Sequence, residues 1–314
     1  MKPRFSFGEA IGAPFILIRQ RPFSVFVWGL LMIAMIVAIY SVVLPAFLSL
    51  PLSAGGEAAW NAYSVEMLQL QAVSNGLSVL MYLVLLVVFN AAGRATLAPG
   101  VRDRFLFMRL GMDEVRVAVV VVATFLGWYV AVLVLVLLGV AIGFATWPLG
   151  EATVIAVLIG YGVLVLVATI VGWTRISLMG PATLILHRFA LTEGWAIGRG
   201  QVLKLVGMHL VVWVLYVLTY LVVGVAIGAI LIGGFVGQGL VWPEAVETPQ
   251  DLLPIARAMA VPLVATVPVL AFAYGAFIAL MAAPSVRAAR QLLDGGPSEP
   301  RPTAASSPDT LQTA

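Results

Sequence analysis

The sequence predicts an all-α fold: a polytopic membrane bundle of six transmembrane helices with interfacial amphipathic helices. Hydrophobic residues make up 62% of the 314 positions and charged residues only 10%, whereas a soluble domain carries about 25% charged residues. Six long stretches contain no charge, and the charges between them change sign from gap to gap. This composition excludes a cytosolic enzyme, a disordered protein and a nucleic-acid binder.

Each charge-free stretch holds one span, since crossing a hydrocarbon core of about 30 Å takes roughly 20 apolar residues in a helix. Helices are expected because lipid cannot satisfy unpaired backbone groups, and segments such as 115–143 lack the alternation of a transmembrane β-strand. The first stretch is too long and begins too late for a signal peptide, so we expect it to be retained. The predicted spans cover residues 24–44, 73–92, 117–139, 153–173, 208–228 and 262–282.

The charged residues between the spans predict the orientation. Gaps on the side of both termini hold 16 of the 17 basic residues and 8 of the 14 acidic residues, a net charge of +8. Gaps on the other side hold Arg257 and six acids, a net charge of −5. The positive-inside rule therefore places both termini in the cytoplasm. Residues 1–293 form the predicted membrane domain, and the proline-rich residues 294–314 are expected to be a disordered cytoplasmic tail.

Three cytoplasmic approaches to a span share one pattern. Residues 7–28, 102–129 and 188–216 each place an apolar stretch and a basic cluster before the span. The pattern suggests three helical-hairpin repeats, each a surface helix followed by two spans. The alternative is that any multi-span protein places arginine at the interface. Residues that can cap the helix starts and favour the helix dipole are Asp113, Glu114, Thr192 and Glu193.

Two segments on the opposite side of the membrane are longer than a tight turn. Residues 54–71 mix aromatic, leucine and methionine residues with two glutamates, which predicts an amphipathic helix on the outer surface. Residues 241–257 contain three prolines and three acids and predict an ordered loop with a short helix. Trp147 and Trp242 are expected at the membrane interface, as aromatic-belt residues.

No catalytic, cofactor-binding or metal-binding set is predicted. The chain has no cysteine, two histidines, His187 and His209, and no acid within a predicted span. Zinc sites, buried acid–base catalysis and ion-coupled transport are therefore disfavoured. His187, Ser177 and Glu193 could meet at the cytoplasmic face as a catalytic triad, but helix capping explains Glu193 better.

The densest cytoplasmic basic group is a candidate site for anionic lipid head groups, which bind at roughly 1 kcal/mol per base near a membrane surface. The alternative is that these residues only fix the topology. The group consists of Arg175, Arg188, Arg199, Lys204 and His209. Small residues four positions apart predict close helix packing, within the chain or between copies. These pairs are Gly139–Gly143, Gly224–Gly228 and Ala229–Gly233.

The segment between the fourth and fifth spans, residues 173–213, reads WTRISLMGPATLILHRFALTEGWAIGRGQVLKLVGMHLVVW. It resembles the six-span membrane domain that is fused to some bacterial glycerophosphodiester phosphodiesterases, and the similar stand-alone YciC-like proteins. The matching positions are Arg175, Ser177, Leu178, Pro181, Ala190, Leu191, Trp195, Arg199, Gly200, Leu205 and Gly207. The chain contains no phosphodiesterase domain. The resemblance therefore implies a bacterial inner-membrane protein, without the enzymatic activity.

We therefore expect a non-enzymatic integral inner-membrane protein, acting as a scaffold, an accessory subunit or a membrane-homeostasis factor. Its expected partners are membrane lipids, through anionic head groups at the cytoplasmic face, and a membrane protein or a second copy of the chain. No cofactor and no nucleic acid is expected. The alternative is a transporter or flippase for a lipid or another amphiphile, which requires a cavity between the three repeats.

Overall fold

The computed structural model describes residues 5–48, 57–101, 106–109, 111–240 and 253–295. In this part of the chain six helices are long and apolar enough to cross a membrane. The protein is therefore a multi-pass membrane protein, and the predicted helical bundle is confirmed. The long helices are α2 (Pro22–Leu48), α3 (Glu57–Leu97), α4 (Met112–Thr146), α5 (Glu151–Ile176), α8 (Val202–Gly237) and α10 (Ala260–Leu293). Each predicted span lies within one of them.

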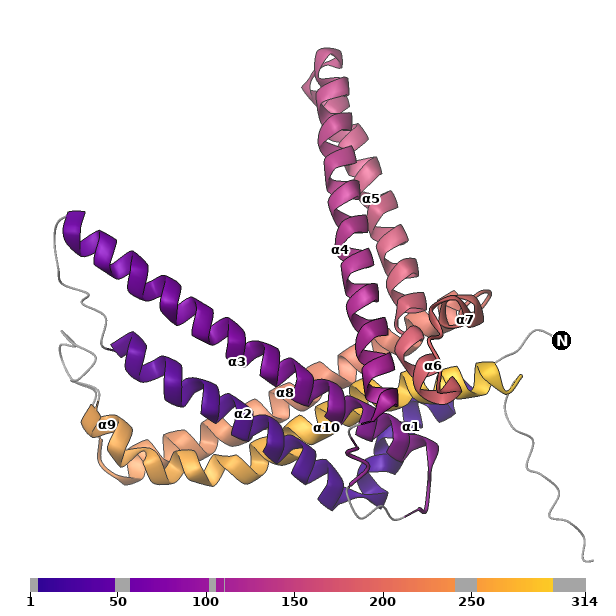
Figure 1. Ribbon diagram of the computed structural model, residues 1–314. Coiled ribbons are helices and arrows are strands. Elements are labelled where there is room, and N and C mark those ends of the chain that lie inside the picture. The colour runs from indigo at the N-terminus through magenta and orange to yellow at the C-terminus, as the bar shows by residue number, and fades with distance from the viewer. Residues whose placement is uncertain (1–4, 49–56, 102–105, 110, 241–252, 296–314) are drawn as a thin grey trace, which may run out of the picture.

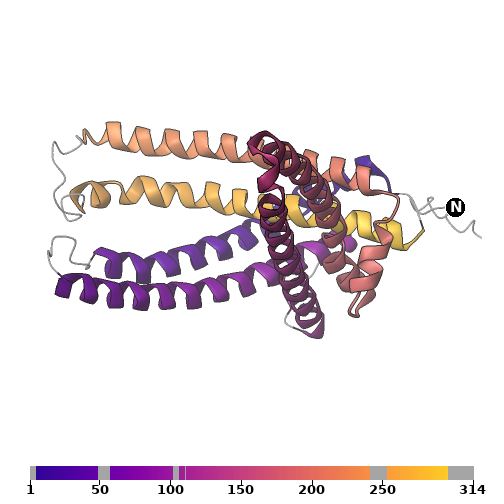
Figure 2. The ribbon, with the colours of Figure 1, turned by 90° about the horizontal axis from the view of Figure 1, so that it is seen from above.

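Four long helices lie side by side in a single layer, in the order α8, α10, α2, α3 (Figure 2). The hairpin of α4 and α5, closed by the short 3-10 helix η1 (Trp147–Leu149), rises away from this layer (Figure 1). Short helices lie around one end of the layer, where α3, α5 and α10 also end; this end is referred to below as the base. They are α1 (Phe7–Gln20), α6 (Met179–Leu186) and α7 (Leu191–Ile197). The short helix α9 (Leu253–Ala258) lies at the opposite end.

Helix α10 is the centre of the layer and packs against α1, α2, α3 and α8. Its buried face is made largely of alanine and glycine, which lets neighbouring backbones approach closely. The closest approach is to α2: a Cβ atom on Gly275 would overlap the carbonyl oxygen of Val25, and one on Gly29 would overlap that of Ala271. The glycines therefore set the spacing of these two helices.

Two clusters of buried apolar residues hold the base together. One joins α1, α2, α3 and α10 around Trp28, whose side chain is fully buried. The other joins α1, α6, α8 and α10 around Leu205 and Met208. Most buried side chains thus lie at the base, because beyond it four helices pack in a single layer and the α4–α5 hairpin stands apart from that layer (Figure 1). In α3, α4, α5 and α8 only 6% of the most apolar window is buried.

Polar contacts fasten α1 across the end of α10. The Gln291 amide accepts a hydrogen bond from the Ser6 backbone N–H (2.8 Å) and donates one to the Glu9 carboxylate (2.6 Å). Arg287 forms an ion pair with the same carboxylate at 2.8 Å. The Gln291 side chain is buried, so both of its polar atoms are satisfied where water is scarce.

The α4–α5 hairpin is held by small-to-aromatic contacts. A Cβ atom on Gly139 would lie 2.9 Å from the Tyr161 ring, and one on Gly172 would lie 2.9 Å from the Trp128 ring. The Tyr161 hydroxyl donates to the Leu135 carbonyl at 2.5 Å. The predicted Gly139–Gly143 pair is therefore used for packing inside the chain.

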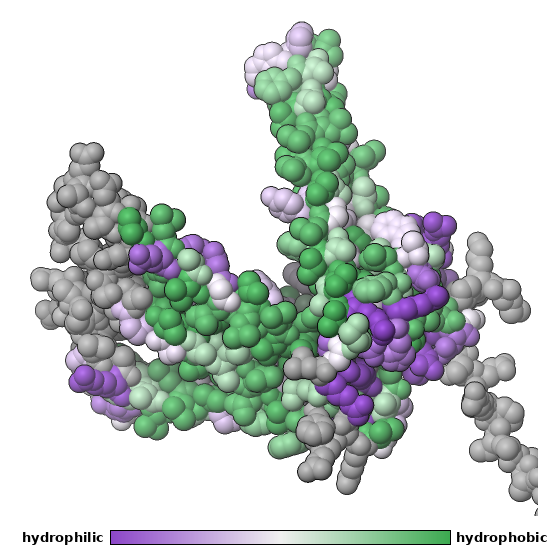
Figure 3. Space-filling model, in the orientation of Figure 1, coloured by the Kyte–Doolittle hydropathy of each residue, from purple (hydrophilic) through white to green (hydrophobic). Residues whose placement is uncertain are grey.

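The small residues of α8 behave differently from those of α4. No atom lies within 4 Å of the Cβ positions of Gly224, Gly228 and Gly233, in the described part of the chain. Together with the exposed apolar faces of the layer and the hairpin (Figure 3), they form surface that a lipid bilayer would cover.

Two predictions about local structure need correction. The predicted outer helix over residues 54–71 is not a separate element, because residues 57–71 continue without a break into α3. No glycine or proline interrupts residues 57–75, so nothing in this segment stops the helix. The three repeats are also uneven: α1 precedes α2 and α7 precedes α8, but the described residues between Leu97 and Met112 contain no helix.

Helix α6 was not predicted, although its sequence is apolar; at eight residues it is too short to span a membrane. The predicted short helix in residues 241–257 corresponds to α9. Trp147 is exposed within η1, as a belt residue would be. Trp242 and the tail beyond residue 295 lie outside the described residues.

Candidate functional site

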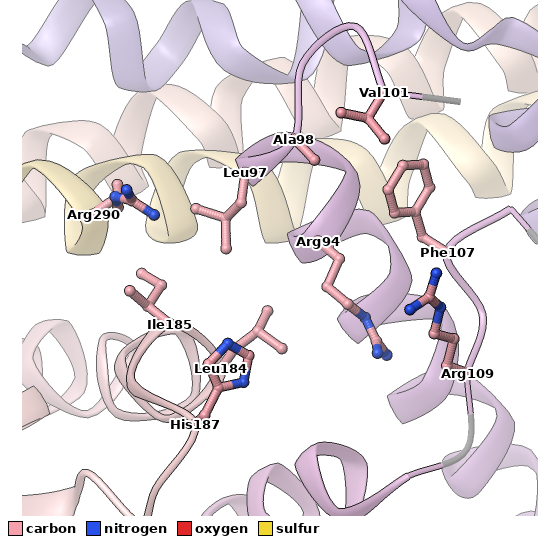
Figure 4. Close-up of a pocket in the computed structure, with 10 residues that line it drawn as sticks. All are labelled: Arg94, Leu97, Ala98, Val101, Phe107, Arg109, Leu184, Ile185, His187 and Arg290. Atoms are coloured by element: carbon pink, nitrogen blue, oxygen red, sulfur yellow. The ribbon is translucent and has the colours of Figure 1, made fainter. Parts of the chain in front are cut away.

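A pocket of about 570 Å³ opens at the base, between the end of α3, the loop that follows it, α6 and α10 (Figure 4). This volume is in the usual range for small-molecule sites. Apolar and cationic side chains share its wall, and no carboxylate is among the described residues that line it. The lining residues are Arg94, Leu97, Ala98, Val101, Phe107, Arg109, Leu184, Ile185, His187 and Arg290.

Helix ends position three of the four basic side chains of the pocket. Arg94 lies in the last turn of α3, and Arg290 in the last turn of α10. His187 ends α6 in the left-handed backbone conformation (φ 52°), which reverses the chain direction at the pocket wall. These residues come from distant parts of the sequence and meet because α3, α6 and α10 all end at the base.

Trp28 of α2 and Arg21, which directly precedes α2, hold the loop after α3 in place. The Trp28 indole donates to the Leu106 carbonyl at 3.2 Å, and the Arg21 guanidinium donates to the Ala98 carbonyl at 2.6 Å. The same guanidinium lies 4.3 Å above the Phe107 ring, a favourable cation–π geometry. These contacts fix the position of the loop side of the pocket.

Acidic partners from the start of α4 and the end of α10 surround the cations. Arg94 pairs with Glu114, whose carboxylate also accepts the Gly111 backbone N–H at 2.9 Å. The predicted helix-start role of Glu114 is thereby confirmed. The Asp113 carboxylate is 2.8 Å from both His187 and Arg116. Arg290 pairs with Asp294 at 2.6 Å.

The predicted basic group divides into residues with protein partners and exposed residues. Arg175 lies over the Trp195 ring at 5.2 Å, and Arg188 pairs with Glu193 at 3.1 Å. The half-buried His209 donates from Nδ1 to the Leu205 carbonyl at 2.8 Å. Arg199 and Lys204 are exposed. None of the five lines the pocket, and their contact with lipid stays a prediction.

The proposed meeting of His187, Ser177 and Glu193 is not supported by their contacts. His187 faces Asp113, and the Ser177 hydroxyl donates to the Thr174 carbonyl at 2.9 Å. Hydrogen bonds from its own backbone N–H and from the Thr192 hydroxyl, together with the charge of Arg188, hold the pKa of Glu193 below its usual value. Glu193 is thus a stabilised carboxylate at the start of α7.

The fold and this site define the class: an α-helical multi-pass membrane protein with an amphipathic, arginine-rich pocket at one end. No protein-family model, no curated protein and no solved structure matches the chain.

The pocket was not predicted, because its basic residues are not close together in the sequence. Arg94, Arg109, His187 and Arg290 are separated by up to 103 positions between neighbours in sequence. One signal was available: Arg94 follows a charge-free stretch directly, and Arg290 follows another by four residues.

Proposed function

We propose that the chain is a non-enzymatic integral membrane protein of the bacterial inner membrane, with both termini in the cytoplasm, that binds phospholipids at its base. It would act as a scaffold, an accessory subunit or a membrane-homeostasis factor, and its membrane domain would be of the YciC-like kind. The observation that carries this proposal is the pocket at the base, where arginines and apolar side chains line one wall.

The charge distribution supports the orientation. The side of both termini carries 16 of the 17 basic residues, and such an excess of bases is typical of cytoplasmic loops. The ion pairs at the base support a structural and binding role over acid–base chemistry. Asp113, Glu114 and Glu193 each pair with a basic neighbour.

Purification of the full chain in a mild detergent, followed by native mass spectrometry, tests the proposal. We expect anionic phospholipids to be enriched in the protein sample over their share of the membrane extract, with or without a copurified membrane protein. A lone monomer that retains no lipid and no partner would contradict it.

A second candidate is a transporter or flippase for a lipid or another amphiphile. The observation that favours it is the separation of the α4–α5 hairpin from the four-helix layer, with apolar side chains exposed on both (Figure 3). An amphiphile could move between two such surfaces with its tails in lipid. The assay is transbilayer movement of a fluorescent phospholipid in proteoliposomes, read by dithionite quenching. Movement no faster than in protein-free vesicles would exclude this candidate and leave the scaffold role.

A further inference from the structure

The base pocket lies where two long apolar helices end. Arg94 and Arg290 occupy the last turns of two long apolar helices, where a helix leaves the hydrocarbon core and enters the head-group region. Apolar side chains from α3, the loop and α6 line the same pocket, among them Leu97, Phe107 and Ile185. A ligand that fits this wall has a charged group and an apolar part within a few ångströms of each other.

The charge around the pocket favours an anion. Five guanidinium groups lie in or directly against the wall, since Arg21 contacts Ala98 and Phe107, and Arg116 shares Asp113 with His187. The other three are the lining residues Arg94, Arg109 and Arg290. Ion pairs with Asp113, Glu114 and Asp294 neutralise part of this charge. The described residues that line the pocket include three arginines and no carboxylate.

The side-chain chemistry selects phosphate among anions. Guanidinium presents several N–H donors in a planar fork that matches phosphate oxygens, and it loses hydration more easily than an ammonium group. Arg94, Arg109 and Arg290 present such groups from three different elements around one space (Figure 4).

We propose that this pocket binds the phosphate of an anionic phospholipid, with the glycerol and first methylenes against Leu97, Phe107 and Ile185. The proposal deepens the function proposed above and rests on it, because it names the ligand and the residues that hold it. It also places lipid recognition at the ends of α3 and α10, and not at the exposed basic residues Arg199 and Lys204.

Thermal unfolding of the full chain in detergent, with three added probes, tests the site. The probes are dihexanoyl phosphatidylglycerol, dihexanoyl phosphatidylcholine and inorganic phosphate. The wild type should be stabilised by the phosphatidylglycerol at concentrations where the phosphatidylcholine has no effect. Arg109→Gln and Arg290→Gln should each raise the half-maximal phosphatidylglycerol concentration by about fivefold, as expected for loss of one base near an anionic lipid.

Arg19→Gln is the matched control, because Arg19 is exposed, lies outside the pocket and the predicted basic group, and carries the same charge. It should change the half-maximal concentration less than about twofold, as a loss of surface charge alone would. Arg290→Lys keeps the charge but loses the planar fork, so it should bind the phosphatidylglycerol more weakly than the wild type. It also covers the case in which Arg290→Gln does not fold, since an unchanged affinity would overturn a role for the Arg290 guanidinium.

Three outcomes separate the hypotheses. If the pocket variants respond like Arg19→Gln while the wild type still copurifies with anionic lipid, the pocket is wrong and the proposed function stands. If the wild type retains no lipid and responds to none of the probes, both are wrong. If inorganic phosphate alone stabilises the wild type as much as the phosphatidylglycerol does, phosphate recognition stands and a lipid source is overturned.

Discussion

At the contact between α2 and α10, two glycine residues leave no room for a side chain. Gly275 faces the Val25 carbonyl, so Gly275→Val should force the helices apart. Overpacking of this kind costs about 1–3 kcal/mol, and a clash with backbone belongs at the upper end. The measurement is the unfolding midpoint of the purified chain in detergent.

Gly228→Val is the control for that substitution, because no described atom lies within 4 Å of its Cβ position on α8. It adds the same side chain in a long apolar helix and should leave the midpoint nearly unchanged. Equal losses of stability in the two variants would mean that the α2–α10 contact is looser than the structure indicates.

The ion pair of Arg94 and Glu114 joins α3 to the start of α4, and the Glu114 side chain is only 6% exposed. Glu114→Leu alone should destabilise the chain by about 3–5 kcal/mol, because a mostly buried guanidinium loses its carboxylate. Arg94→Met combined with Glu114→Leu should recover much of that loss, since the buried charge is then removed as well. A double-mutant cycle of unfolding midpoints checks this, and a double variant that is less stable than Glu114→Leu would contradict it.

Among the elements, α1 depends on a small number of side-chain contacts with α10. Gln291→Ala removes hydrogen bonds to the Ser6 backbone and to Glu9. Hydrogen bonds of this kind contribute about 0.5–1.5 kcal/mol each. Amide hydrogen exchange of residues 7–20 should therefore become about tenfold faster, while exchange in α5 stays the same. Asp294→Asn, which alters the neighbouring pair with Arg290, is the control and should leave α1 protected.

The long helices could be predicted from the sequence because their formation depends on the local run of apolar residues and not on tertiary contacts. An apolar run of more than 20 residues becomes a helix in lipid whatever its neighbours are. The sequence did not distinguish a separate outer surface helix from an extension of the second span. Residues 57–71 look amphipathic in both arrangements, and in the structure they are part of α3. Helix α6 was missed because eight apolar residues give no span signal.

On the scale of the whole molecule, the sign of the charge in each connecting segment predicts the topology. The chain has no cysteine, so a single introduced thiol reports its own position. Arg199→Cys should react with a membrane-impermeant maleimide only in inverted vesicles, and Ala152→Cys, at an exposed position at the start of α5, only in intact spheroplasts. The same side for both residues would contradict the six-span arrangement.

The layer, the hairpin and the pocket are properties of the assembled molecule and could not be predicted from the sequence. When every face of a helix is apolar, the sequence pattern does not indicate which helices pack against each other. The order α8, α10, α2, α3 could therefore not be predicted. The pocket arises because α3, α6 and α10 end at one level. Its cations come from separate gaps, each of which reads in the sequence as ordinary positive-inside charge.

The central position of α10 has a consequence for biogenesis. Helix α10 is translated after α2, α3 and α8, all of which pack against it. During synthesis these three helices enter the membrane before α10 has been made. Until then, Gly29 of α2 lacks its contact with Ala271, and the Glu9 carboxylate lacks its contacts with Arg287 and Gln291. Final assembly of the layer therefore has to follow the synthesis of α10. A ribosome that stalls before residue 260 would leave α2, α3 and α8 without the helix against which all three pack.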